Sequence, residues 1–168
     1  MRASFRGQSV QKLDSKGRVS IPASFRDELV KESGEIGPQR FILVFGQAES
    51  RGYLEGYTPA GMARLERKIR KLPQFSDARE NAEEIFINNS VEMEIDITGR
   101  IVLPQALRGR IGATEELLFL GQLDTFRIRV PEAAAAERAA RAARMVPGDP
   151  ASDPYAALGA LMMDEDDE

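Results

Sequence analysis

The chain contains the segment Leu13-Asp14-Ser15-Lys16-Gly17-Arg18-Val19-Ser20-Ile21-Pro22 and repeats its pattern 82 positions later as Ile95-Asp96-Ile97-Thr98-Gly99-Arg100-Ile101-Val102-Leu103-Pro104. Both copies follow the pattern apolar-Asp-x-x-Gly-Arg-apolar-x-apolar-Pro. The match continues beyond the proline, where Phe25-Arg26 corresponds to Leu107-Arg108. Such a repeat indicates that one structural unit occurs twice in the chain.

Each copy predicts a strand, a tight turn, a second strand and a short helix. An Asp side chain accepts hydrogen bonds from backbone N–H groups two residues on, and the following Gly supplies a positive φ. A proline suits the start of a helix, because the first helical turn does not use its missing N–H. We therefore interpret four residues as structural, turn-forming positions: Asp14, Gly17, Asp96 and Gly99.

The pattern Asp-x-x-Gly-Arg-x-x-x-Pro resembles the AbrB/SpoVT-type swapped-hairpin DNA-binding domain. Two copies in one short chain, the first preceded by Phe5-Arg6-Gly7, resemble the MraZ family of bacterial transcriptional regulators over roughly residues 4–144. The resemblance implies an α+β fold in which both copies interlock their hairpins into one pseudo-twofold swapped-hairpin β-barrel, with helices outside. It also implies a ring-shaped homo-oligomer that binds repeated promoter elements in double-stranded DNA. The implied targets are the division and cell-wall gene cluster and the protein's own operon.

Two interpretations of the motif arginines stay open. Arg18 and Arg100 either pair with the turn aspartate or offer a guanidinium to a DNA phosphate or to guanine. Copy one carries Lys12 and Lys16 where copy two has Glu94 and Thr98, which predicts a stronger attraction for phosphate around copy one. The resemblance adds the arginine after the helix-opening proline as a lesser contact. The candidate DNA-binding residues are therefore Lys12, Lys16, Arg18, Arg26, Arg100 and Arg108.

Composition narrows the classes of function. The 168 residues include no cysteine and no histidine, which removes thiolate nucleophiles, disulfides and the commonest general base and metal ligand. We therefore expect no enzyme activity, no cofactor or metal and no small-molecule substrate. No apolar run of membrane-spanning length occurs, and the first residues lack the apolar core of a signal peptide. A cytoplasmic, nucleoid-associated protein without a membrane partner is the expectation.

The charge is unevenly distributed along the chain. The net charge is −4, yet residues 1–72 carry 14 lysines and arginines against 8 acidic residues, whereas residues 145–168 carry 7 acidic residues and no basic one. Phosphate binding requires a local basic face and not a basic chain. The overall charge is therefore compatible with a nucleic-acid partner.

The chain is expected to divide into five segments. We expect a first AbrB-like module at 7–51, a return strand and linking helices at 52–89, and a second module at 90–133. A C-terminal helix at 134–146 and a disordered acidic tail at 147–168 complete the chain. Residues 1–6 are expected to be frayed, with docking of Phe5 on a neighbouring surface as the alternative. Helices are predicted at 22–32, 59–72, 76–86 and 131–145. The basic stripe Arg64, Arg67, Lys68, Arg70 and Lys71 is interpreted as the solvated face of a helix, with attraction of nucleic acid as the alternative.

Two other classes of function are weighed against the regulator. AbrB-type modules also serve as antitoxins, and a helix at residues 155–163 that folds on a partner would serve to grip a toxin. An enzyme would need carboxylates and lysines that converge in a pocket, and the sequence shows no such set.

Overall fold

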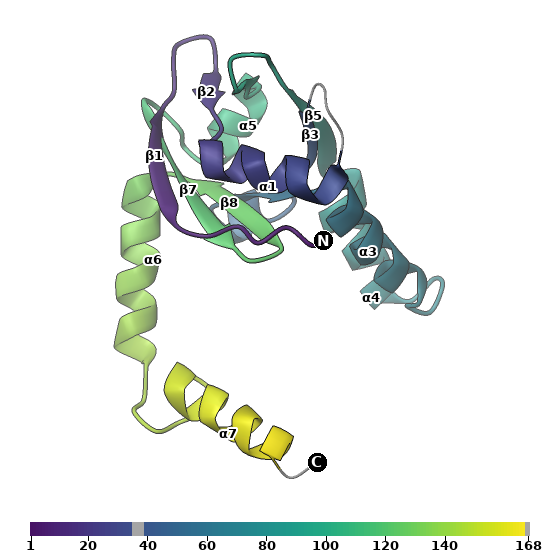
Figure 1. Ribbon diagram of the computed structural model, residues 1–168, viewed down its shortest axis with the longest axis vertical. Coiled ribbons are helices and arrows are strands. Elements are labelled where there is room, and N and C mark those ends of the chain that lie inside the picture. The colour runs from purple at the N-terminus through teal and green to yellow at the C-terminus, as the bar shows by residue number, and fades with distance from the viewer. Residues whose placement is uncertain (35–38, 167–168) are drawn as a thin grey trace. The chain divides into compact units, whose positions relative to one another are not determined.

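The computed structural model describes residues 1–34 and 39–166 (Figure 1). The chain forms two compact units, Met1–Pro131 and Glu132–Glu168. Unit one combines antiparallel strands with helices, so the predicted α+β class is confirmed. In the described part of the chain, no helix has both the length and the apolar character needed to cross a membrane.

The first copy of the repeat folds in the predicted order. Strand β1 (Gln8–Lys12) leads through the turn into β2 (Arg18–Ser20), and helix α1 (Ala23–Ser33) follows Pro22. Helix α1 buries Phe25 and Leu29 and ends at Gly34, whose left-handed conformation lets its N–H donate to the Val30 carbonyl. Strand β3 (Gln39–Val44), the short helix α2 (Ala48–Arg51) and strand β4 (Leu54–Tyr57) complete this half. The connection between β3 and β4 thus contains one helical turn.

Two helices link the copies, and both begin close to the predicted positions, after a residue whose side chain caps the helix. Helix α3 (Pro59–Arg70) starts after Thr58, whose hydroxyl accepts from the Gly61 N–H. Helix α4 (Asp77–Glu83) starts after Ser76, whose hydroxyl accepts from the Arg79 N–H. It continues into a π-helical turn, η1 (Glu84–Asn88), which the sequence did not predict.

The second copy repeats the order of the first. It comprises β5 (Ser90–Ile95), β6 (Arg100–Val102), α5 (Gln105–Arg110), β7 (Glu116–Gln122) and β8 (Thr125–Arg129). Strands of the two copies pair with one another. Strand β1 pairs with β7, β3 with β5, β4 with β8, and β2 with β6, all antiparallel.

The predicted closed barrel is wrong for the described residues. The strands form an open six-stranded sheet in the order β1-β7-β8-β4-β3-β5 and a separate two-stranded ribbon of β2 and β6. The ribbon strands are only three residues long, and they pair with each other instead of extending the edges β1 and β5. Two edges of the large sheet therefore remain where a barrel would have closed.

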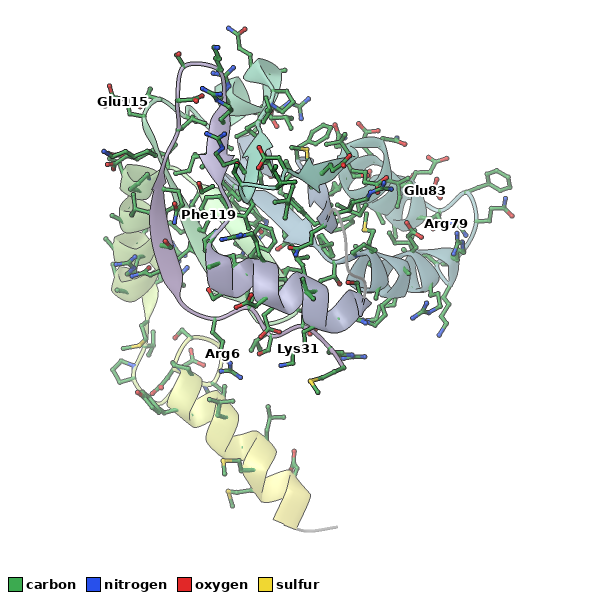
Figure 2. The ribbon with its side chains drawn as sticks, turned by 45° about the horizontal axis from the view of Figure 1, so that its top comes forward. Arg6, Lys31, Arg79, Glu83, Glu115 and Phe119 are labelled. Atoms are coloured by element: carbon green, nitrogen blue, oxygen red, sulfur yellow. The ribbon has the colours of Figure 1, made fainter. Side chains whose placement is uncertain are left out.

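Aromatic side chains fill the core between α1 and the sheet. Phe25 of α1 lies 5.3 Å from Phe126 of β8 and 6.4 Å from Phe119 of β7, measured between ring centroids. Figure 2 shows Phe119 in the interior of the unit. Such tilted and edge-on contacts stabilise a core beyond the area that the rings bury.

The expected frayed N-terminus is instead part of this core. Phe5 is 1% exposed, and its ring meets Phe25 and Phe126 at centroid distances of 5.5 and 5.1 Å. Its backbone forms a bridge with Leu123. Two carboxylates of α1 hold the preceding residues, since Glu32 accepts from the Ala3 N–H and Glu28 accepts from the Ser4 N–H. These partners are distant in sequence, so no local pattern indicates that they hold the segment.

Unit two is helical. Helix α6 (Pro131–Arg144) is joined by a turn to α7 (Pro154–Asp166), and Asp153 caps α7 by accepting from the Tyr155 N–H at 3.0 Å. The predicted disorder over 147–168 is therefore not confirmed, and residues 167–168 lie outside the described residues. Asp153 followed by Pro154 is a sequence signal for the start of a helix. The prediction of disorder gave more weight to the acidic composition of the tail than to this signal.

Candidate nucleic-acid interface

The turn of copy one is built around the Asp14 carboxylate. One oxygen, Oδ1, accepts from the backbone N–H groups of Lys16 at 3.0 Å and Arg18 at 2.8 Å. The other, Oδ2, accepts from Nε of Arg18 at 2.6 Å. The pair with Asp14 thus uses one edge of the Arg18 guanidinium and holds that side chain beside the turn.

The turn of copy two is similar but uses an additional hydroxyl. Oδ1 of Asp96 accepts from the N–H of Thr98 at 2.9 Å, from its hydroxyl at 2.6 Å, and from the Arg100 N–H at 3.0 Å. Nε of Arg100 donates to the Thr98 hydroxyl at 2.9 Å and lies 3.9 Å from Oδ2 of Asp96. Arg100 is therefore held through Thr98 more than through the carboxylate.

Both aspartates are stabilised in the charged form. The pKa of Asp14 lies below its ordinary value because the Arg18 backbone N–H and then the Arg18 side chain donate to it. The pKa of Asp96 is lowered first by the Thr98 hydroxyl and then by the Arg100 backbone N–H. At neutral pH each turn therefore contains an anion that its own arginine and backbone N–H groups offset.

The turns of the two copies contact each other reciprocally. The Ile21 N–H donates to the Gly99 carbonyl at 2.9 Å, and the Leu103 N–H donates to the Gly17 carbonyl at 2.7 Å. A Cβ on Gly17 would lie 2.4 Å from the Leu103 carbonyl oxygen, and φ at Gly17 is +86°. Glycine is therefore required at Gly17 both by its conformation and by the approach of the other copy.

Arg26 and Arg108 take part in these contacts. A Cβ on Gly99 would lie 2.7 Å from the Arg26 guanidinium, so Arg26 packs over the turn of copy two, and Arg108 packs in the same way over Gly17. Nε of Arg26 donates to the Ile21 carbonyl at 3.2 Å, and Nε of Arg108 donates to the Leu103 carbonyl at 3.1 Å. The structure thus gives both arginines a role in joining the copies, which the sequence did not predict. The only sequence signal for this role was that an arginine stands nine positions after each turn glycine.

The ribbon of β2 and β6 brings Arg18 and Arg100 onto one face. In its register Val19 lies opposite Ile101, and both side chains are 1% exposed. Arg18, opposite Val102, and Arg100, opposite Ser20, therefore belong to the other, outward face. A shallow groove on this side is lined by Lys12, Leu13, Asp14, Arg18, Val19, Ser20 and Arg100. We call the outward face of β2 and β6, together with Lys12 and Lys16, the turn face.

The turn face is more cationic beside copy one than beside copy two. Lys12 and Lys16 are exposed, and neither has an acidic side chain within 4.0 Å among the described residues. The groove beside the turn of copy two instead contains Glu94 and Asp96 with Arg26. The described residues contain no group of three acidic side chains that could hold a metal ion. The turn face therefore offers mainly hydrogen-bond donors and positive charge.

The chain is similar in sequence to proteins of one family. The family model described as "MraZ protein, putative antitoxin-like" matches residues 4–84 and 86–140. A protein of Ruegeria sp. (strain TM1040) named "Transcriptional regulator MraZ" is 43% identical over 131 residues, which cover 76% of this chain and 78% of the relative. Relatives of the same name are 39% identical over 88% of this chain in Cereibacter sphaeroides (strain ATCC 17029 / ATH 2.4.9) and 37% identical over 86% in Parvibaculum lavamentivorans.

The matched residues include both turns, both ribbon strands and every strand of the large sheet. The identity exceeds 30% over more than two thirds of each of these relatives. Because the family model and the individual relatives agree, this chain belongs to the MraZ family.

Proposed function

We propose that the protein is a transcriptional regulator that binds double-stranded DNA in a sequence-specific way through the turn face. The observation that carries the proposal is the convergence of Arg18 and Arg100 on the outward side of one β-ribbon, with Lys12 and Lys16 beside it. The relatives' name, transcriptional regulator, supports the same function.

A two-stranded β-ribbon has the dimensions that the major groove of B-DNA admits. Arg18 is held by Asp14 through Nε, which leaves its terminal nitrogens to donate to guanine N7 and O6 or to a phosphate. The ammonium groups of Lys12 and Lys16 neutralise phosphates on either side of the ribbon. Arg100 is the matching contact of copy two, and Arg26 and Arg108 are lesser contacts at its borders.

The pairing of strands between copies supports a swapped-hairpin arrangement of two modules, residues 7–51 and 90–133. One turn face offers only a few cationic contacts, and non-specific DNA binding at physiological salt is typically weak, with Kd about 10⁻⁴ to 10⁻⁶ M. In a ring-shaped homo-oligomer, repeated turn faces engage repeated promoter elements, which raises avidity about 10² to 10⁴-fold. The targets that we propose are the division and cell-wall gene cluster and the protein's own operon.

The proposal is tested with the double variant Lys16→Ala/Arg18→Ala. Loss of one phosphate contact and one base or phosphate contact should lower the affinity for the upstream DNA of its own operon at least about 10-fold. The matched control is Arg6→Ala/Lys31→Ala, which removes the same two residue types elsewhere; Figure 2 shows both side chains below α1. Gel-shift titration and circular dichroism are the measurements. An unchanged affinity in a well-folded Lys16→Ala/Arg18→Ala variant would overturn the proposal.

One observation favours a second candidate, an antitoxin that binds a toxin through α7. Tyr155, Leu158, Leu161, Met162 and Met163 are all more than half exposed. An apolar helix surface of this kind suits a partner protein. Co-expression with the neighbouring reading frames separates the two candidates, because an antitoxin forms a stoichiometric complex with one small partner and loses it when residues 147–168 are deleted.

A further inference from the structure

A second cationic surface lies apart from the turn face. A groove is formed by the N-terminus, helix α3 and the turn between β7 and β8. Its charged lining residues are Arg2, Arg64, Arg67, Lys68, Lys71 and Asp124. Five cations thus face one acid, and the groove shares no lining residue with the groove of the turn face. We call it the α3 groove.

Four of these cations form one continuous line along α3 and its C-cap, namely Arg64, Arg67, Lys68 and the C-cap residue Lys71. They occupy positions i, i+3, i+4 and i+7, which lie along one side of a helix and span about 10 Å. Arg64 is held at the inner end by Glu32, 3.2 Å away, whose side chain is 5% exposed. Arg67, Lys68 and Lys71 are exposed, and within the described residues no acidic side chain lies within 4.0 Å of them.

The line of cations is more than an ordinary solvated helix face. Positive charges at the C-terminal end of α3 interact favourably with the helix dipole, which accounts for Arg67, Lys68 and Lys71 but not for Arg2 or Arg64. Like charges at i and i+4 repel, and this occurs twice in the line. An ordinary exposed face carries both signs interspersed.

The opposite flank of α3 shows such an ordinary face. There Glu66 and Arg70 border a pocket with Arg79 and Glu83 of α4, so the charges balance. Arg79 also pairs with Glu83 at 2.8 Å, and both side chains are marked in Figure 2. The excess of positive charge is therefore confined to the side of α3 that lines the groove.

We propose that the α3 groove binds the sugar-phosphate backbone of double-stranded DNA, without regard to base sequence, as a second contact surface beside the turn face. This inference rests on the proposed function. A duplex presents closely and regularly spaced negative charges, which a straight line of flexible cations neutralises. An acidic peptide fits less well, because the groove offers few apolar side chains; Leu65 is one, and the Tyr57 hydroxyl is already used in a 2.6 Å bond to Glu55.

The test uses the full chain with the triple variant Arg67→Gln/Lys68→Gln/Lys71→Gln. Glutamine has a helix propensity close to that of these residues, but its side chain is shorter and carries no charge. The matched control is Arg138→Gln/Arg141→Gln/Arg144→Gln, which removes three cations from α6. Binding is measured to operon DNA and to an unrelated duplex of equal length over a range of salt concentrations, with circular dichroism as the check of folding.

The groove variant should bind both duplexes about 10-fold or more weakly at physiological salt. The slope of log affinity against log salt should fall by about 2 to 3, since each lost phosphate contact removes about 0.9. The ratio of specific to non-specific affinity should stay unchanged, which separates this effect from that of Lys16→Ala/Arg18→Ala. The control should keep wild-type affinity and slope.

Each other outcome overturns one of the two proposals. Unchanged affinity and slope in a folded groove variant exclude DNA from the groove and leave the proposed function intact. An equal loss in the α6 control shows that only total charge matters, which also overturns the inference. A short polyglutamate peptide that binds wild-type protein more tightly than the duplex does, and loses binding in the groove variant, reassigns the groove to acidic protein. If the wild type shows no preference for operon DNA, the proposed sequence-specific function is wrong. Binding of the groove variant to the unrelated duplex then still tests whether the α3 groove contacts DNA.

Discussion

At the scale of the residue, the turn glycines Gly17 and Gly99 have two roles. Each allows its own turn to form, and each lies in contact with the other copy. Gly17 adopts φ +86° and Gly99 φ +82°, so each needs glycine for its own turn. Each also receives a group of the other copy at short range, the Leu103 carbonyl at Gly17 and the Arg26 guanidinium at Gly99. A substitution at either glycine therefore disturbs a turn and the joint between the copies together.

Gly17→Ala should destabilise the protein more than Gly7→Ala does. Gly7 has a similar φ of +80°, but a Cβ there would meet nothing within 4 Å, so it reports the conformational cost alone, about 1–2 kcal/mol. At Gly17 the collision with the Leu103 carbonyl adds about 1–3 kcal/mol. Urea unfolding of both variants measures the difference. Equal losses of stability would show that the copies do not approach as closely as described.

The free energy of unfolding should fall at acidic pH, and part of this fall should depend on Asp14. Its folded-state pKa lies below the ordinary value of 3.8, so its ionised form contributes stability that is present above about pH 4 and is lost as the pH falls through the folded-state pKa. Asp14→Asn removes the Arg18 ion pair, so the stability of wild type should exceed that of the variant at pH 6 and approach it near pH 2. Urea unfolding across this range is the measurement, with the exposed Asp27→Asn as the control. If the difference in unfolding free energy between wild type and Asp14→Asn grew as the pH fell, the stabilising role of the Asp14 carboxylate would be contradicted.

At the scale of elements, the N-terminal segment completes the hydrophobic core. Phe5 lies among Phe25 and Phe126, and carboxylates of α1 hold the two residues that precede it. The pKa of Glu32 shows both influences, because burial raises it while the Ala3 N–H, Thr58 and Arg64 together lower it below its ordinary value. The segment therefore closes one side of the sheet instead of extending into solvent.

Phe5→Ala should cost about 3–5 kcal/mol, as expected for truncation of a fully buried aromatic ring. The neighbouring control Val10→Ala, at a side chain that is 52% exposed, should change stability by less than about 0.5 kcal/mol. Thermal and urea unfolding give both values. A loss below about 1 kcal/mol at Phe5 would mean that the segment frays after all.

The sequence predicted elements well where their signals are local. Thr58 and Ser76 start helices because each hydroxyl meets an N–H three residues on, which only the neighbouring sequence determines. The burial of Phe5 could not be predicted in this way, because Phe126 is 121 positions away. The π-helical turn Glu84–Asn88 was not predicted either, because such turns are rare.

At the scale of the whole molecule, the two halves of the chain depend on each other. Four of the six strand pairings in the described residues join residues before position 75 to residues after it. The local pattern predicted both turns and their arginines. It could not predict that Arg26 lies over Gly99 and Arg108 over Gly17, because those contacts exist only after the halves have combined.

A cut between Gln74 and Phe75 should therefore leave the protein assembled. Phe75 is 81% exposed in the loop between α3 and α4, so an inserted protease site there is accessible. The fragments should co-elute in size-exclusion chromatography under native conditions and separate in urea, because each contains strands whose partners lie in the other. Two fragments that separate and remain folded without urea would contradict this mutual dependence.

The pairing of β1 with β7 also has a consequence for protein synthesis. Val10 lies opposite Leu118, so the first strand emerges from the ribosome 108 residues before its partner. At about 5–20 residues per second, this delay lasts about 5 to 20 s. During that interval the nascent β1 exposes an unpaired edge, and slowing translation of the second half prolongs the time in which nascent chains on one messenger can aggregate.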